Sequence, residues 1–461
     1  MRRLGIAGYC VLGALAGGVL AATYARAQTV GEVPSQPPNS PMQTAPKALR
    51  AAPAADALPQ PLTLEQALSL AEEAHPALRL QHAAVLDGDA ALAQAHARDD
   101  AELVFELTPQ AIHPTNAADD EFVDDSRARL ILGKTLYDFG RTRHAISAAD
   151  ANRRARLQRY ADARAQQRIT IMRRFFDVLL ADLRYAVDNE AMAQAFVQFD
   201  RLRDRHGVGQ VSDIDLLESE DRFQVRRVQR QASLARQSAS RQRLALALNR
   251  PGTLPRDLTA PKLADLGRAL PEFDALLPLV LQHNPVLLAA RKEREATHAT
   301  LAAERRRAYP VLRGEAEAAY YERELASRDD RRVMLSLRVP LYQGGAVDAA
   351  VAGARAAQAE QEARLALAEF DLRDALYALL QEMELLTAKR QAAAVRTKYR
   401  DLYLDRSRAL YELEVRTDLG DAMVRNTEAA YESAQADYEL ALAWARLRAL
   451  LGEAELPETS P

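Results

Sequence analysis

The chain has 461 residues, a formal net charge of −3 and 27% charged residues. This near-neutral balance, without a basic excess or interleaved basic and aromatic residues, argues against a nucleic-acid-binding protein. The only cysteine is Cys10 near the N-terminus, so we expect neither disulfides nor thiol ligands in the rest of the chain. The sequence also has no Gly-rich phosphate loop and no histidine pair at metal spacing. We therefore predict no enzyme, no cofactor and no metal site.

Residues 1–27 have the pattern of a signal peptide for export. Arg2 and Arg3 precede an apolar segment that ends near Ala22, and Ala25-Arg26-Ala27 resembles a cleavage site. Cleavage would remove three arginines and no acid, so the charge would become −3 − 3 = −6. The alternative is an N-terminal membrane anchor, which this Gly-rich and short segment does not favour.

Residues 28–61 are rich in Pro and Ala and predict a disordered linker. Beyond it the composition predicts helices of unusual length. Residues 141–206 and 354–419 contain no Gly and no Pro, and a helix of this length extends about 100 Å. Return helices are expected over 212–249 and 421–451. Because ordinary helices average about 11 or 12 residues, this pattern excludes an ordinary globular domain.

Two apolar stripes at helical spacing predict packing seams inside these helices. They consist of Leu372, Leu376, Leu379, Met383 and Leu386 in the second long helix, and of Phe176, Leu179, Leu180 and Leu183 in the first. Beyond residue 27 there is no apolar run long enough for a transmembrane helix. If the chain enters a membrane, we expect it to do so as strands.

Three motifs of the first half recur in the second half and predict an internal duplication. His75-Pro76-Ala77-Leu78 matches Asn284-Pro285-Val286-Leu287, Leu136-Tyr137-Asp138-Phe139-Gly140 matches Leu341-Tyr342-Gln343-Gly344-Gly345, and Val211-Ser212-Asp213-Ile214 matches Arg416-Thr417-Asp418-Leu419. The offset is 209 residues for the first match and 205 for the other two. The difference places a longer hairpin loop in the first half.

Each half also contains two segments in which apolar and polar residues alternate. They cover 101–108 and 127–134 in the first half, and 311–321 and 332–339 in the second. Alternation over about nine residues is typical of strands in a membrane β-barrel, although a half-buried sheet in a soluble domain gives the same pattern. Four strands cannot close a barrel in lipid, so a barrel would have to be shared. Three copies would supply about twelve strands.

At this point the sequence resembles the TolC-like outer-membrane factor family (outer membrane efflux proteins). The resemblance extends from Leu62 to about Glu455 and rests on the duplicated motifs, on the opening Leu62-Thr63-Leu64-Glu65-Gln66-Ala67-Leu68 and on the turn Gly209-Gln210-Val211-Ser212-Asp213. It implies a first repeat over 62–250 with a strand pair about 101–138, a second repeat over 251–455 with a strand pair about 309–343, and a C-terminal tail over 456–461.

The resemblance further implies a mainly α fold with a small β part. Long antiparallel helices would form a trimeric α-barrel tunnel across the periplasm, and four strands per chain would join a shared twelve-stranded barrel in the outer membrane. Such a homotrimer would be surrounded by outer-membrane lipid. It would meet a periplasmic adaptor (membrane fusion) protein and an inner-membrane pump of the RND or ABC type, which supplies the energy. The chain itself would be a passive conduit.

In this family an acidic ring narrows the inner end of the tunnel. The matching residues are Asp418 and Asp421, which the resemblance makes pore-lining acids of the periplasmic aperture. It places closing contacts between neighbouring tips at Asp215, Tyr411 and Arg416. Six carboxylates around one opening would attract cations. The alternative is that the acids only complement a helix dipole.

Two other functions stay open from the sequence. A soluble periplasmic coiled-coil scaffold would explain the helices and the signal peptide, although not the two-faced strands. Within the family, type I secretion of proteins competes with efflux of small molecules, because the pump determines what is transported.

Overall fold

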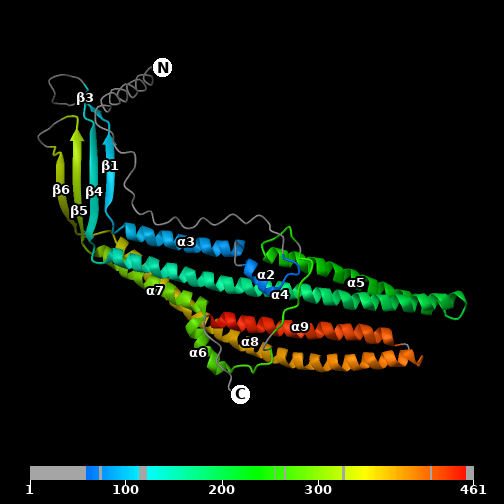
Figure 1. Cartoon of the computed structure of the whole chain (residues 1–461). Helices are drawn as coiled ribbons and strands as arrows, with labels where there is room; N and C mark the ends of the chain where they lie inside the picture. The colour runs from blue at the N-terminus through cyan, green and yellow to red at the C-terminus, as the bar shows by residue number, and fades with distance from the viewer. Residues whose placement is uncertain are drawn as a thin grey trace, which may run out of the picture. The chain divides into compact units, whose positions relative to one another are not determined.

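The computed structural model describes residues 59–71, 75–113, 122–253, 255–263, 266–323, 328–415 and 418–452. The predicted signal peptide, most of the predicted linker and the C-terminal tail lie outside the described residues. The described chain is mainly helical with a few strands, as the sequence predicts (Figure 1). Its elements are α2 (Leu64–Ala71), α3 (Pro76–Ala97), β1 (Glu102–Thr108), β2 (Ala111–Ile112), β3 (Val123–Asp124), β4 (Arg127–Tyr137), α4 (Arg141–Gly207), α5 (Asp213–Ala247), α6 (Phe273–His283), α7 (Pro285–Arg305), η2 (Arg306–Ala308), β5 (Val311–Tyr321), β6 (Arg331–Arg338), α8 (Ala346–Glu412) and α9 (Leu419–Leu451).

The two longest helices, α4 and α8, have 67 residues each and extend about 100 Å. The bounds of α4 agree with the prediction to within one residue. The predicted range 354–419 for α8 is wrong, because the helix begins at Ala346 and ends at Glu412. It continues through Gly353, since one glycine inside a long helix costs only about 1 kcal/mol relative to alanine. It ends before Glu414, which has a left-handed φ of 59°.

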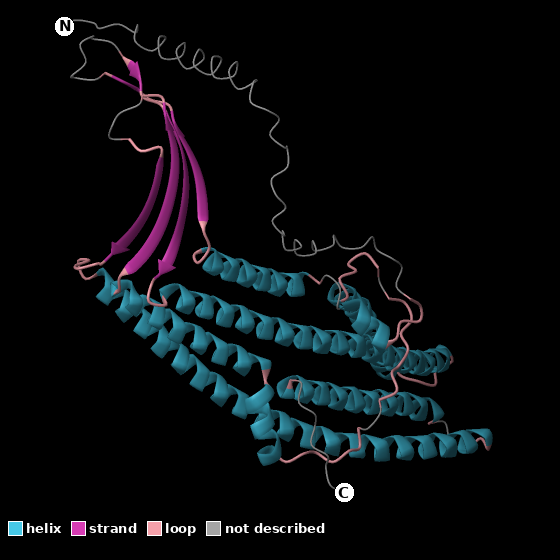
Figure 2. Ribbon diagram, turned by 60° about the vertical axis from the view of Figure 1, so that its left-hand side comes forward, coloured by secondary structure: helices cyan, strands magenta, loops and turns pink. Residues whose placement is uncertain are grey.

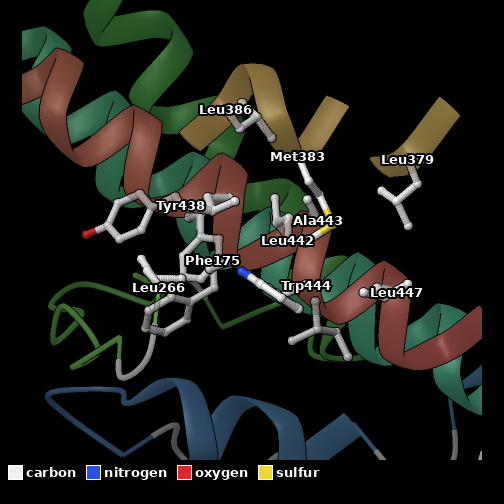
Figure 3. Close-up of a cluster of buried hydrophobic side chains, with 14 of the residues drawn as sticks. Phe175, Leu266, Leu379, Met383, Leu386, Tyr438, Leu442, Ala443, Trp444 and Leu447 are labelled. Atoms are coloured by element: carbon white, nitrogen blue, oxygen red, sulfur yellow. The ribbon is translucent and has the colours of Figure 1, made fainter. Parts of the chain in front are cut away.

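The helices pack along one another through apolar faces. Helix α4 packs against α3, α5, α7 and α9, and α8 packs against α7 and α9. All members of the predicted stripe in α8 are buried; in α4 the buried residues include Phe175 and Val178, whereas Leu180 and Leu183 are only half-buried. The ring of Phe176 stacks on Tyr438 of α9, with centroids 4.5 Å apart. Figure 3 shows this core, in which α4, α8 and α9 meet.

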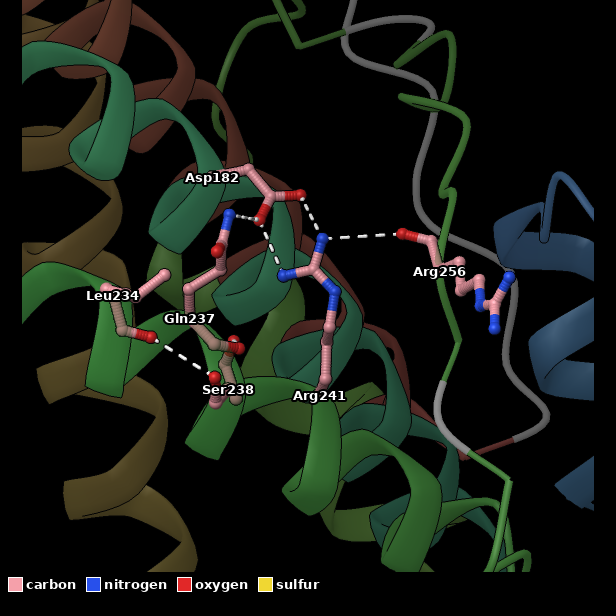
Figure 4. A network of polar contacts seen from close by, with 7 residues as sticks. Asp182, Leu234, Gln237, Ser238, Arg241 and Arg256 are labelled. Atoms are coloured by element: carbon pink, nitrogen blue, oxygen red, sulfur yellow. Dashed lines mark hydrogen bonds and ion pairs between the residues drawn. The ribbon is translucent and has the colours of Figure 1, made fainter. Parts of the chain in front are cut away.

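A polar clasp also joins α4 to its return helix α5. Arg241 of α5 donates two hydrogen bonds to the carboxylate of Asp182 on α4, with distances of 2.7 and 2.9 Å. Gln237 donates a third at 2.8 Å, and Arg241 also reaches the carbonyl oxygen of Arg256 in the segment that follows α5 (Figure 4). A bidentate pair of this kind fixes the register of two helices as well as their distance.

The duplicated motifs lie at equivalent points of the chain. His75 and Asn284 cap the N-termini of α3 and α7, and a proline follows each as the first helical residue. The His75 Nδ1 accepts a hydrogen bond from the amide of Ala77 at 3.3 Å, and Asn284 accepts from the amide of Val286 at 3.0 Å. Proline suits this position because the first helical amides have no partner in the helix.

The second pair of motifs forms the turns from a strand into a long helix. Phe139 and Gly140 have φ values of 56° and 84°, and Gly344 and Gly345 have 60° and 78°. The two turns therefore share the same pair of left-handed residues. In the first turn, Asp138 accepts hydrogen bonds from the Gly140 amide and from the amide and hydroxyl of Thr142. Burial raises the pKa of Asp138, but these hydrogen bonds outweigh it and hold the pKa below its ordinary value.

The four main strands form one antiparallel sheet in the order β1-β4-β5-β6 (Figure 2). The strand bounds differ from the predicted ones by at most three residues. Strands β4 and β5 pair over Arg127–Tyr321 to Tyr137–Leu312, so the two predicted hairpins join into a single sheet. A second small hairpin of β2 and β3 was not predicted; it lies within the region expected to be a loop.

No single helix in the described ranges is both long and apolar enough to cross a membrane. Helix α6 and the helical segment Pro285–Ala308, bent by 45° at their junction, meet the criteria only as a pair.

Candidate functional site

Most side chains on one face of the sheet are apolar, with Lys134 and Arg331 as charged exceptions, and no described part of the chain covers this face. The register places Leu103, Phe105, Leu107, Leu130, Leu132, Val333, Leu335 and Leu337 on this face. Val333 is 88% exposed and Phe105 is 67% exposed. Such a continuous apolar surface requires an apolar partner, because soluble proteins rarely leave one open. This face agrees with the alternation that the sequence predicts.

The opposite face of the sheet holds a ladder of ion pairs. Arg129 on β4 contacts Glu106 on β1 at 2.5 Å and Glu317 on β5 at 3.6 Å. Glu317 also pairs with Arg332 on β6, and its side chain is only 6% exposed. Arg313 and Glu102 form a more distant pair at 3.8 Å. The ladder connects all four strands and pairs six of the charged residues of this face with one another.

The first helical tip is the turn between α4 and α5. Gly209 has a φ of 73°, and its amide bonds to the carbonyl oxygen of His206. Ser212 caps α5 by accepting a hydrogen bond from the amide of Asp215, and its hydroxyl donates to the Asp215 carboxylate at 2.7 Å. The exposed side chain of Asp215 is therefore held by the hydroxyl of the N-cap residue at the helix start. Among the described residues, Asp215 and Tyr411 form no hydrogen bond with each other.

The second helical tip is the turn between α8 and α9. Tyr411 lies in the last turn of α8 and is 51% exposed, and the amide of Glu414 bonds to its carbonyl oxygen. Glu414 takes the left-handed conformation for which glycine is the preferred residue. Arg416, the third predicted closing residue, lies outside the described residues.

Asp418 stands at the N-cap position of α9, yet its side chain does not cap the helix. Its Oδ2 instead accepts a hydrogen bond of 2.8 Å from the hydroxyl of Tyr403 on α8. The other oxygen, Oδ1, is buried and has no hydrogen-bond partner among the described residues. The Asp418 side chain is thus hydrogen-bonded to α8, the other helix of its own hairpin.

Asp421 lies in the first turn of α9 and forms an ion pair with Arg425, one turn later. The Arg425 Nε donates to Asp421 Oδ2 at 2.7 Å, and this hydrogen bond raises the pKa of Arg425. Both side chains are half-exposed. The pair offsets the negative charge that Asp421 would contribute to a pore. The spacing of four residues could have indicated it in the sequence, whereas the role of Tyr403 had no sequence signal.

Helix α9 is held against α4 close to this tip. Gly420 approaches Gln194 so closely that a Cβ at this position would lie 3.1 Å from its side chain. Thr427 donates a hydrogen bond of 2.7 Å to Glu190. The structure therefore joins the second hairpin to the first through α4, and the two predicted acids belong to a packed hairpin end.

Residues 276–453 match the family model of outer membrane efflux proteins. The resemblance to the TolC-like outer-membrane factor family is confirmed by this match and by the fold.

Solved structures with this fold share little sequence identity with the chain. The outer-membrane channel CusC has a TM-score of 0.69 at 16% identity, covering 85% of this chain and 92% of CusC. The Campylobacter jejuni CmeC outer membrane channel has a TM-score of 0.69 at 13% identity, covering 84% and 85%. The outer membrane protein VceC from Vibrio cholerae has a TM-score of 0.67 at 15% identity, covering 84% and 96%. No curated protein sequence matches the chain.

Proposed function

We propose that the protein is the outer-membrane exit channel of a tripartite transport system, a passive conduit through the periplasm and the outer membrane. The two-faced sheet carries this proposal. Its uncovered apolar face suits lipid, and its ion-paired face suits a water-filled lumen, which is the arrangement that a membrane-spanning sheet requires. The matching family model and the similar channel structures support the same function.

The channel is a homotrimer in this proposal. Strands β1 and β6 are the edges of the four-stranded sheet, and in lipid their open backbone groups need partners. If β1 of one copy pairs with β6 of the next, three copies close the twelve-stranded barrel expected from the sequence. The long helices then line a tunnel that ends at a periplasmic adaptor protein and an inner-membrane pump, of the RND or ABC type.

The oligomer can be tested by measuring the mass of the purified protein in detergent. We expect a stable trimer with all of its β-structure. A monomer with the same β-structure would exclude the shared barrel and leave a coiled-coil scaffold as the better explanation. Both small-molecule efflux and type I protein secretion fit this channel, because the pump determines what is transported.

The aperture is the narrow end of the tunnel in this proposal, lined by Asp418 and Asp421. Because Arg425 pairs with Asp421, the two residues of this pair should act in opposite directions. Arg425→Gln should raise cation preference and strengthen block by a trivalent cation, whereas Asp421→Asn should lower both. Recordings from single trimers in planar bilayers measure both quantities.

The matched control is Arg154→Gln. Arg154 forms an i,i+4 pair with Asp150 near the start of α4, far along that helix from the tip. The Arg154→Gln variant should leave the cation-to-anion ratio unchanged. If Arg425→Gln and Asp421→Asn shift the ratio no more than the control does, the aperture does not lie at these residues, even if the trimer forms.

A further inference from the structure

A cavity of about 750 Å³ lies among the helices, away from the sheet and from the helical tips. It is bordered by α4, the end of α9, the start of α7 and the segment that follows residue 261. The buried side chains of Ile169, Leu266 and Trp444 contribute apolar walls. The volume is within the range of small-molecule sites, roughly 300–1,000 Å³.

The first feature of the cavity wall is a buried tryptophan. Trp444 is the only tryptophan of the chain. It is 5% exposed, and its indole N–H has no hydrogen-bond partner among the described residues. Figure 3 shows this nitrogen among the core side chains near Phe175. The nitrogen has almost no solvent-exposed area, so Trp444 borders the cavity through its ring while its N–H lies inside the core.

The second feature of the cavity wall is a set of cationic side chains. The guanidinium of Arg268 lies over the Trp444 ring at 3.5 Å from its centroid, and Arg168 also borders the cavity. Lys262 and Arg448 complete the set, and both are exposed. Neither of these two has an acid at ion-pair distance within the described ranges. The described lining residues include no carboxylate.

We propose that this cavity binds an amphiphilic anion, a molecule with one carboxylate or phosphate group on an aliphatic body. The walls suit the aliphatic body, while the exposed cations Lys262 and Arg448 suit the anionic group. A free inorganic anion would leave the apolar walls unused, and a neutral amphiphile would leave the cations unused. This proposal depends neither on the conduction pathway nor on the oligomeric state.

The position of Trp444 makes the test direct, because it is the only tryptophan whose emission a ligand can change. The full chain is held in amphipol, without detergent micelles, and titrated with dodecanoate, dodecanol or inorganic phosphate. Dodecanoate should change the emission and saturate at one molecule per chain. Dodecanol and inorganic phosphate should each bind at least tenfold more weakly. Saturation by phosphate alone would identify a free-anion site and overturn the amphiphile.

The variant Lys262→Gln/Arg448→Gln should bind dodecanoate at least tenfold more weakly. Its matched control is Lys398→Gln/Arg406→Gln, which removes two exposed cations from α8 and should bind like the parent protein. A far-ultraviolet spectrum like that of the parent shows that a variant is folded. Equal binding by the two double variants, equal binding of dodecanol and dodecanoate, or no saturable binding to the parent would each overturn the proposal.

Discussion

Two glycines near the start of α8 should respond in opposite ways to the same substitution. Gly345 immediately precedes the helix and has a φ of 78°. Gly353 lies inside the helix, eight residues later. A Cβ built at either position meets no atom within 4 Å. Replacement by alanine therefore adds no steric clash at either site, and the backbone conformation alone decides the outcome.

The magnitudes follow from that conformation. An L-residue in the left-handed region costs about 1–2 kcal/mol, so Gly345→Ala should destabilise the helix start. Alanine also restricts the unfolded chain by about 0.4–1 kcal/mol, which leaves a net loss of about 1 kcal/mol. Gly353→Ala should stabilise the helix by about 1 kcal/mol, since alanine is the better helix former. The two variants should differ by about 2 kcal/mol.

Hydrogen exchange measured on peptides from residues 346–356 resolves this local effect better than thermal melting does. We expect Gly345→Ala to lower protection in the first turns by about fivefold and Gly353→Ala to raise it by about as much. Gly140→Ala provides a matched third variant, measured on peptides from residues 141–151, because Gly140 takes the same position before α4 with a φ of 84°. Equal protection in all variants would show that neither the left-handed turn nor Gly353 affects the stability of the helix start.

Three further perturbations test other parts of the structure. Burial lowers the pKa of His75 from its ordinary value of 6.5. The cap of α3 should therefore be fully stable above pH 6.5 and weaken as the pH falls through the lowered pKa. His75→Asn should remove this pH dependence, which hydrogen exchange of α3 measures. Ala181→Pro should destabilise α4 by about 3 kcal/mol or more, measured by urea unfolding, and an unchanged midpoint would contradict a continuous helix. The double variant Arg129→Gln/Glu317→Gln removes both partners of a ladder pair, so bilayer recordings should show an almost unchanged cation-to-anion ratio; a shift as large as that of Asp421→Asn would mean that the sheet contributes to selectivity.

Much of the fold follows from local sequence rules. Residues 141–206 lack Gly and Pro, and α4 covers this stretch almost residue for residue. The alternation in 311–321 defines β5 and both of its faces, because side chains in a strand point to opposite sides in turn. The end of α8 could not be predicted in this way. Glu414 has no sequence signal for a left-handed conformation, and the turn depends on tertiary context.

The candidate aperture shows the same division between local and non-local signals. The sequence placed Asp418 and Asp421 at the start of a return helix, where both lie. Their partners decide what charge they present, and only one of the two partners is local. Arg425 lies on the same helix as Asp421, whereas Tyr403 reaches Asp418 from α8 across the turn. Long-range side-chain partners of this kind need the packed hairpin.

The sheet and the helical tips, which form the two ends of the proposed channel, differ in the charge that they present. On the ion-paired face of the sheet, the register places the arginines 127, 129, 313, 332 and 338 and the glutamates 102, 106, 315 and 317. The net charge of this face is therefore 5 − 4 = +1. Several of the charged residues form short ion pairs with one another. A charge that is paired at short distance contributes little to the field along a pore. In the proposed channel, ion preference should then depend on the helical tips, where Asp418 accepts a hydrogen bond from the Tyr403 hydroxyl and forms no ion pair among the described residues. In the proposed channel, the sheet would supply a polar lumen of nearly neutral charge, and the acids of the helical tip would determine ion selectivity.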